Sequence, residues 1–167
     1  MFKILDAADH NDYSKWLRIW ESWPLREVFA HPEYVKLFAR GCDRAVCAVQ
    51  ENADGMILLP LILRPLAAEP WAGKDTPYFD AVAPYGFGGP FINGRYDMEE
   101  FGRHFKAWAQ NVGIVSAFFR LSPFAADIRN MVDTVDVSGG NVIRSLSEGY
   151  DEIWRDYKQL VRTHVKK

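Results

Sequence analysis

The sequence lacks the long apolar run and the N-terminal signal that would place a chain in or across a membrane. Its longest apolar run, residues 56–63, contains a proline and is far shorter than the roughly 20 residues of a spanning helix. Residues 1–6 do not show the charged and then apolar order of a secretory signal. The sequence therefore predicts a cytoplasmic protein with no membrane span.

Cysteine and histidine are scarce, which limits disulfide and metal chemistry. The two cysteines, Cys42 and Cys47, are five positions apart, and Cys47 belongs to a strand-like run. If one strand held both, their side chains would lie on opposite faces of the sheet, where neither a disulfide nor a shared metal ion is favoured. The four histidines show no ligand spacing such as a pair at i and i+4. We expect reduced, buried thiols and no metal site.

The chain has no large excess of charge of one sign. Its 20 Lys and Arg residues oppose 22 Asp and Glu residues, which gives a formal net charge of −2, whereas nucleic-acid-binding domains usually carry a concentrated basic excess. The exception is the C-terminal segment, with Arg155, Lys158, Arg162, Lys166 and Lys167. A solvated helix face is the favoured interpretation, and binding of an aminoacyl-tRNA is kept as an alternative.

What the sequence does contain is ample material for a core, with 49% hydrophobic and 14% aromatic residues. Its apolar periodicity and turn signals predict alternating helices and strands. Helices are expected at 12–23, 31–41, 97–111 and from 147 onward, and strands at 45–51, 56–64, 76–83, 114–121 and 142–146. This order favours an α/β (α+β) fold with a mixed β-sheet, in a single domain over residues 1–167.

Local signals refine several of these elements. Asp12 or Ser14 is expected to cap the first helix, whose tryptophans are interpreted as core residues. The Asp-Gly pair in residues 52–55 predicts a hairpin, and Pro60 predicts an edge or a bulge in its second strand. Asp97 and Glu100 form a capping-box pattern at the start of the third helix.

The most unusual segment is the glycine loop, residues 84–90, in which Gly86, Gly88 and Gly89 fall within four positions. Such a loop permits positive φ and close backbone approach, as a phosphate cradle would need. However, no Lys-Ser or Lys-Thr pair follows, and the next helix opens with acidic residues that would repel an anion. A rigid turn that displays Tyr85 and Phe87 to a cleft is therefore preferred over phosphate binding.

Two charged residues in apolar runs are further candidates, although the spacing reveals no catalytic residue, nucleophile elbow or catalytic triad. Asp80 lies in a strand-like run, where it would serve as a general base or, more commonly, cap a turn or pair with an arginine. Arg120 lies among Phe118, Phe119 and Leu121, and an ion pair and an anion-binding role are equally compatible with it.

Several segments together resemble the first half of Fem-type (FemAB-like) aminoacyltransferases of the GNAT acyltransferase superfamily. The glycine loop is the most specific of them. The others are Leu59-Pro60-Leu61, Tyr78-Phe79-Asp80, Phe118-Phe119-Arg120-Leu121-Ser122-Pro123, Asn141-Val142-Ile143-Arg144-Ser145-Leu146, Glu152-Ile153-Trp154 and Arg162-Thr163-His164-Val165-Lys166-Lys167. The resemblance covers nearly the whole chain and implies a GNAT-like mixed β-sheet flanked by helices.

The resemblance also implies a function. Fem-type proteins carry two GNAT-like domains in tandem and transfer an activated amino acid or other acyl group to an amine, often on a peptidoglycan precursor of the cell wall. The chain is thus expected to be an N-terminal half that is truncated before a second GNAT-like domain. The Arg/Gln-x-x-Gly-x-Gly/Ala signature for the CoA pyrophosphate is absent, so no cofactor is expected in this chain, and an acyl-CoA or aminoacyl-tRNA donor would serve the full-length enzyme.

By this interpretation the chain is the acceptor-binding half of an acyltransferase. Tyr85, Gly86, Phe87, Gly88 and Gly89 would shape the substrate cleft together with Asp80, and Arg64 or Arg120 would meet an acidic acceptor such as a nucleotide-linked sugar peptide. The alternative is a non-catalytic interaction module, in which the aromatic residues around Gly86 to Phe91 and the basic last helix dock a second domain or another copy of the chain.

Overall fold

The structure is a computed structural model that describes residues 1–122, 131, 132, 134–136, 139, 140, 143, 145 and 147–165. It divides the chain into two units, Met1–Val135 and Asp136–Lys167. Each unit is described by itself below.

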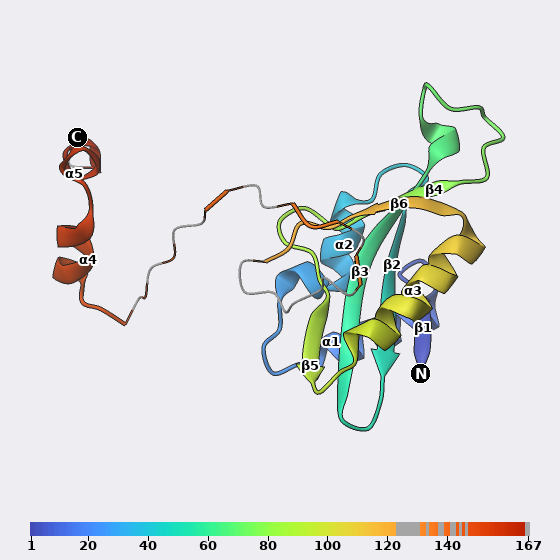
Figure 1. Cartoon of the computed structure of the whole chain (residues 1–167), viewed down its shortest axis with the longest axis horizontal. Coiled ribbons are helices and arrows are strands. Elements are labelled where there is room, and N and C mark those ends of the chain that lie inside the picture. Colours follow the sequence, from blue (N-terminus) through green and yellow to red (C-terminus); the bar gives the residue numbers. More distant parts are fainter. Residues whose placement is uncertain are drawn as a thin grey trace. The chain divides into compact units, whose positions relative to one another are not determined.

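The first unit is built on one mixed β-sheet (Figure 1). The strands lie in the order β1-β2-β3-β4-β6, and β5 pairs with β3. Every pairing is antiparallel except that of β4 with β6, which is parallel. The strands are β1 (Phe2–Asp6), β2 (Arg44–Glu51), β3 (Gly55–Pro65), β4 (Phe79–Val82), β5 (Phe91–Gly94) and β6 (Ile114–Phe118).

The predicted hairpin is confirmed as β2 and β3. The Asn52 side chain closes the turn, because its Oδ1 accepts hydrogen bonds from the backbone N–H groups of Asp54 and Gly55 at 2.9 and 2.7 Å. Pro60 lies inside the central strand β3, in unbroken register with β2, so the expectation of an edge or a bulge is wrong. Its position is nevertheless a local gap, since β5 pairs with residues 55–58 and β4 with residues 62–65. A residue without an N–H donor suits that gap.

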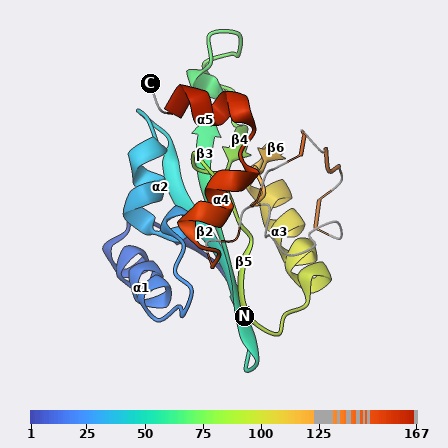
Figure 2. The same cartoon turned by 90° about the vertical axis from the view of Figure 1, so that its left-hand side faces the viewer.

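Helices cover both faces of the sheet (Figure 2). On one side lie α1 (His10–Glu21) and α2 (Pro32–Phe38), with the short 3₁₀ helix η1 (Val28–Ala30) between them, and on the other side lies α3 (Met98–Val112). A second 3₁₀ helix, η2 (Leu66–Ala68), follows β3. Side chains alternate along β2, so Val46 and Ala48 join the core beneath α3, while Cys47 and Val49 join the core beneath α1 and α2.

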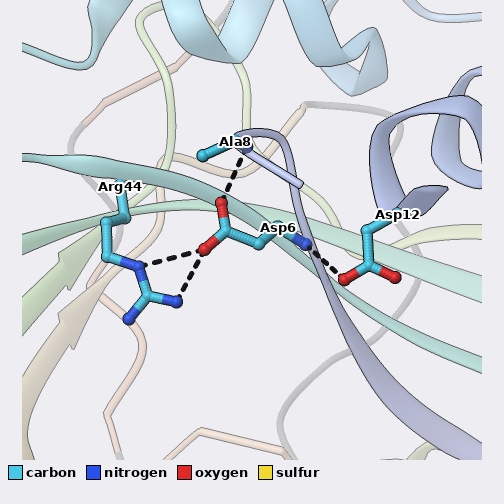
Figure 3. A network of polar contacts seen from close by, with 4 residues as sticks. All are labelled: Asp6, Ala8, Asp12 and Arg44. Carbon is cyan, nitrogen blue, oxygen red and sulfur yellow. Dashed lines mark hydrogen bonds and ion pairs between the residues drawn. The ribbon is translucent and has the colours of Figure 1, made fainter. Parts of the chain in front are cut away.

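Helix α1 begins two residues before the predicted start. Its N-cap is Asp9, whose Oδ1 accepts from the N–H groups of Asn11 and Asp12. Asp12 instead accepts from the N–H of Asp6, and Asp6 accepts from the Ala8 N–H and from the Arg44 guanidinium (Figure 3). This network joins β1, β2 and the start of α1. The core interpretation of the tryptophans is confirmed for Trp16 and Trp23, which are buried.

Helix α3 forms near the predicted bounds, but only half of the predicted capping box is seen among the described contacts, with no hydrogen bond from the Asp97 N–H to the Glu100 side chain. The Asp97 side chain caps its first turn, and Phe101 and Phe105 are buried. The helix ends at Gly113, whose φ of 84° places it in the left-handed region that favours glycine. The chain then enters β6 beside β4. The mixed α/β class with a helix-flanked sheet is therefore confirmed, and it is compatible with a GNAT-like fold without being specific to it.

The second unit contains two short helices, α4 (Tyr150–Asp156) and α5 (Gln159–Val165). The prediction of one helix capped by Ser147 is wrong, because Gly149 occupies the N-cap and the helix is interrupted at residues 157 and 158. The Glu152 carboxylate accepts from the Gly149 N–H at 3.3 Å. Three of the five residues of the predicted strand at 142–146, residues 142, 144 and 146, lie outside the described residues.

Two further expectations concern the burial of the two cysteines and the presence of a membrane-spanning helix. Both cysteines are free, and Cys47 is buried as expected, but Cys42 is exposed in the turn before β2, so the expectation that both are buried is wrong. Among the described residues, each helix is too short or too polar to cross a membrane.

Candidate functional site

The glycine loop is a short excursion of the chain beside β6. The Ala83 N–H donates to the Phe118 carbonyl at 2.9 Å, and the Gly88 N–H donates to the Arg120 carbonyl at 2.6 Å. The two carbonyls are two residues apart, whereas the two donors are five apart. Residues 84–87, which include Tyr85, therefore bulge away from the paired segments of β4 and β6. The loop stands at the carboxyl ends of the parallel strands β4 and β6, where open α/β sheets commonly bind ligands.

Two glycines make this excursion sterically feasible. At Gly88, a Cβ atom would lie 2.4 Å from the Cβ of Ala83, so the base of the loop closes only without a side chain. Gly86 has a φ of 93°, and a Cβ there would lie 2.3 Å from Cε1 of Phe29. Gly89 is buried and precedes the cis peptide bond to Pro90. Because the loop backbone packs against the protein, the contacts favour the rigid turn over an open anion cradle.

Aromatic side chains hold the projecting part of the loop. The loop cluster consists of Phe29, Tyr34, Phe38, Tyr85 and Phe87. The Tyr34 hydroxyl donates to the Tyr85 carbonyl at 3.0 Å, and the ring centroids of Phe38 and Tyr85 are 5.8 Å apart. Phe87 packs edge-on against Phe29 at 5.8 Å. The Tyr85 side chain nevertheless remains 70% exposed, so a fixed backbone presents an aromatic ring to solvent.

Arg64 and Asp80 are paired in register on β3 and β4. Arg64 Nε donates to Asp80 Oδ1 at 2.8 Å, and its Nη2 contacts Oδ2, which makes the pair bidentate. The hydrogen bond to Asp80 raises the pKa of Arg64, and the charges of Asp80, Asp43 and Glu69 act in the same direction. The structure thus gives Asp80 the arginine pairing that the sequence left open. It also surrounds Arg64 with negative charge, which disfavours a second anion there.

The register places three further side chains on the same face. Asp80 pairs with Ser116 and Val82 with Phe118, and Val82 packs against the core beneath α1 and α2. Because the carbonyls of Phe118 and Arg120 both face the β4 side, their side chains share a face as well. We call this set, Ser116, Phe118 and Arg120, the open β6 face, since all three residues are exposed.

The opposite face of β6 is closed. Phe119 and Leu121 pack against the core beneath α3, and the ring centroids of Phe119 and Phe105 are 6.2 Å apart. Arg120 stands between these two apolar residues but points away from them. Its guanidinium makes no ion pair with any other residue that the structure describes. With respect to the described residues, Arg120 is therefore an unpaired cation beside the glycine loop.

Sequence reasoning missed Ser116 and Tyr34. Ser116 is a polar residue in the apolar run 114–119, and that interruption was the only signal for it. Tyr34 touches the loop across 51 residues of sequence, which no local pattern could reveal. A separate surface hollow of about 550 Å³, lined by Asn52, Arg95, Tyr96, Asp97, Met98 and Glu99, contains none of the predicted site residues.

The described residues contain no group of three or more His, Cys, Asp or Glu that could hold a metal ion. The site instead offers an exposed aromatic ring, a paired carboxylate, a hydroxyl and an available guanidinium. Comparison of the chain with protein-family models, with curated proteins and with solved structures finds no match.

Proposed function

We propose that the chain is an acceptor-binding domain of a Fem-type N-acyl or aminoacyl transferase that acts on an amine, such as that of a peptidoglycan precursor or a surface glycan. The observation that carries this proposal is the position of the glycine loop. It is a fixed bend with an exposed Tyr85, located where the parallel strands β4 and β6 end. This is where an α/β sheet offers a ligand the ends of its strands.

The reaction would need little acid–base machinery. The amine nitrogen bonds to the acyl carbonyl carbon, the bond from that carbon to the sulfur or oxygen of the donor breaks, and the amine releases a proton to solvent or to the leaving group. Such chemistry depends largely on positioning, with backbone N–H groups stabilising the oxyanion. The bidentate Arg64–Asp80 pair fits a role in orienting the acceptor, because both carboxylate oxygens of Asp80 already accept hydrogen bonds from Arg64.

The proposal also includes an acyl donor and a second GNAT-like domain. An acyl-CoA or aminoacyl-tRNA would supply the acyl group in the cytoplasm, and a second GNAT-like domain would bind it. This chain would bind the acceptor between the loop cluster and the open β6 face. No cofactor is proposed for the chain itself.

The test is a binding and transfer experiment on the whole chain. A nucleotide-linked sugar peptide with a free amine is titrated into the chain, and amide formation with an acyl-CoA or aminoacyl-tRNA is followed by mass spectrometry, with and without a second GNAT-like domain. Acceptor binding that weakens in Tyr85→Ala supports the proposal, even without transfer by the chain alone. Absence of acceptor binding in both forms contradicts it.

A second candidate function, a non-catalytic interaction module, is favoured by one specific observation. Phe118 is 66% exposed and Tyr85 is 70% exposed on neighbouring segments, and exposed aromatic residues are typical anchors of protein interfaces. Sedimentation velocity separates the two candidates. A concentration-dependent dimer that Phe118→Ala abolishes supports docking, whereas a monomer over the same range supports the ligand site.

A further inference from the structure

The open β6 face combines an aromatic ring with a positive charge that is unpaired within the described part of the chain. Phe118 and Arg120 are two residues apart on one face, so their Cβ atoms are separated by roughly 7 Å. Phe118 is 66% exposed. A ring that stacks on Phe118 would place a substituent within reach of the Arg120 guanidinium.

Arg64, the other arginine that the register places on this face, is already paired, so an anion would favour Arg120. Arg64 lies on the same face but is held by Asp80 in a bidentate pair, with Asp43 and Glu69 close enough to act on it. Arg120 makes no ion pair with any residue in the described part of the chain. A guanidinium presents a planar fork that matches a phosphate or a carboxylate. An anion on this face is therefore expected at Arg120 and not at Arg64.

The glycine loop supplies a wall beside these two residues. Its base is hydrogen-bonded to the carbonyls of Phe118 and Arg120, so Tyr85 projects from the segment directly next to them. The Tyr34 hydrogen bond and the Phe38 ring fix the Tyr85 backbone and side chain. A preorganised aromatic wall reduces the entropy that a ligand loses on binding.

We propose that the open β6 face binds an aromatic ring that carries an anionic group, with the ring on Phe118 beside Tyr85 and the anion on Arg120. The inference rests on the proposed function and deepens it, since it names the chemistry of the acceptor that would occupy the same site. The anion is a phosphate or a carboxylate, because the guanidinium fork recognises both.

The experiment measures binding of four small probes to the whole chain by calorimetry and by NMR of labelled protein. Phenyl phosphate and benzoate carry both features and distinguish phosphate from carboxylate, inorganic phosphate carries only the charge, and benzyl alcohol carries only the ring. We expect phenyl phosphate or benzoate to bind at least about tenfold more tightly than the two single-feature probes. Equal affinity for phenyl phosphate and inorganic phosphate, or no binding of any probe, overturns the proposal.

Variants localise the site. Arg120→Gln should weaken binding of the favoured probe at least about tenfold, Arg120→Lys should retain part of it, and Phe118→Leu should weaken the aromatic probes but not inorganic phosphate. Arg103→Gln is the matched control, because Arg103 is an exposed arginine on α3, at the other face of the sheet. Unchanged affinity in Arg120→Gln overturns the proposal. Arg120 is exposed, so its variants are expected to fold, and their circular dichroism spectra verify this.

The outcome is separable from that of the proposed function. Probe binding at Arg120 in a chain that binds no amine acceptor sustains this inference and contradicts the proposed function. If the chain supports acyl transfer and the KM for the acceptor is unchanged by Arg120→Gln, the proposed function is sustained and this inference is contradicted.

Discussion

The hydroxyl of Tyr34 donates a hydrogen bond of 3.0 Å to the carbonyl of Tyr85. Tyr34 belongs to α2 and Tyr85 to the glycine loop, so this bond ties the loop to the helix layer. The loop cluster completes the connection through the Phe38–Tyr85 and Phe29–Phe87 ring contacts. A segment rich in glycine is thereby held in one conformation, and its exposed tyrosine is presented on a fixed support.

Removal of the Tyr34 hydroxyl should loosen the loop with little effect on the fold. Tyr34→Phe keeps the ring contacts and loses the hydrogen bond, so we expect a loss of about 0.5–1.5 kcal/mol in the free energy of unfolding. Faster amide exchange should be confined to residues 84–88. Urea denaturation and hydrogen exchange measure these effects. Tyr78→Phe is the control, and an equal change in both variants would contradict the role given to the Tyr34–Tyr85 bond.

Substitution at Gly88 should destabilise the first unit. The new methyl group of Gly88→Ala would lie 2.4 Å from the Cβ of Ala83, and relief of such overpacking typically costs about 1–3 kcal/mol. Gly73→Ala is the matched control, because the nearest atom to its new methyl group, Thr76 Oγ1, is 3.6 Å away. Urea titration followed by tryptophan fluorescence compares the two. If Gly88→Ala is as stable as Gly73→Ala, the claim that the base of the glycine loop leaves no room for a side chain at residue 88 is wrong.

The ion pair between Arg64 on β3 and Asp80 on β4 should contribute a modest coupling free energy to stability. The side chains of Arg64 and Asp80 are 43% and 20% exposed, so solvent screens the pair, and a coupling of about 1 kcal/mol is expected. A double-mutant cycle with Arg64→Gln and Asp80→Asn measures it. The surface pair Arg103–Glu99 serves as the reference cycle. A coupling no larger than that of the reference pair would argue against an orienting role for Asp80.

Glu33 should give stability a small dependence on pH. Hydrogen bonds from Lys36 and then Tyr13 lower the pKa of its carboxyl below the ordinary value of 4.5. A carboxyl whose pKa is lower in the folded state stabilises that state above its unfolded pKa, and the contribution is lost as the pH falls through the folded pKa. Glu33→Gln should therefore be less stable than the wild type above about pH 5, with a difference that shrinks toward pH 3. Because the group is exposed, the difference should be small.

The measurement is the free energy of unfolding across that range of pH. Glu99→Gln, at the equivalent position in the first turn of α3, controls for the loss of one negative charge. A difference for Glu33→Gln that grows toward low pH would contradict the direction of the pKa change.

The two cysteines should differ sharply in reactivity. Cys42 is exposed, whereas Cys47 is buried, and burial raises the pKa of the Cys47 thiol well above its ordinary value. Since the thiolate is the reactive species, a thiol reagent should label one site in the folded chain and both in denaturant. Mass spectrometry of Cys42→Ser tests this. Rapid labelling of that folded variant would show that Cys47 is accessible.

Local patterns in the sequence predicted most of the first unit. The Asn52–Gly55 turn and the Asp97 cap each depend on neighbouring residues, and both are confirmed. Strand β1 was missed, because residues 2–6 alternate only weakly between apolar and polar side chains. It becomes a strand by pairing with β2. The interruption between α4 and α5 was also missed, since neither Pro nor Gly occurs at residues 150–165.

The candidate site depends on contacts that local patterns do not contain. The glycine loop could be singled out by composition, but its anchoring to Tyr34 and to the carbonyl of Arg120 joins residues 51 and 32 positions apart. Strand register explains why Arg64 forms an ion pair whereas Arg120 forms none with the described residues. Register pairs Arg64 with Asp80 and leaves Arg120 beyond the last residue of β4.

The most direct test of the central claim is an NMR titration of the labelled whole chain with a nucleotide-linked sugar peptide that carries a free amine. The account predicts that shift changes concentrate at Tyr85, Gly86, Gly88, Phe118 and Arg120, and that Tyr85→Ala weakens binding. Shift changes confined to other surfaces, such as the hollow lined by Arg95 and Tyr96, or no changes at saturating ligand, would contradict it.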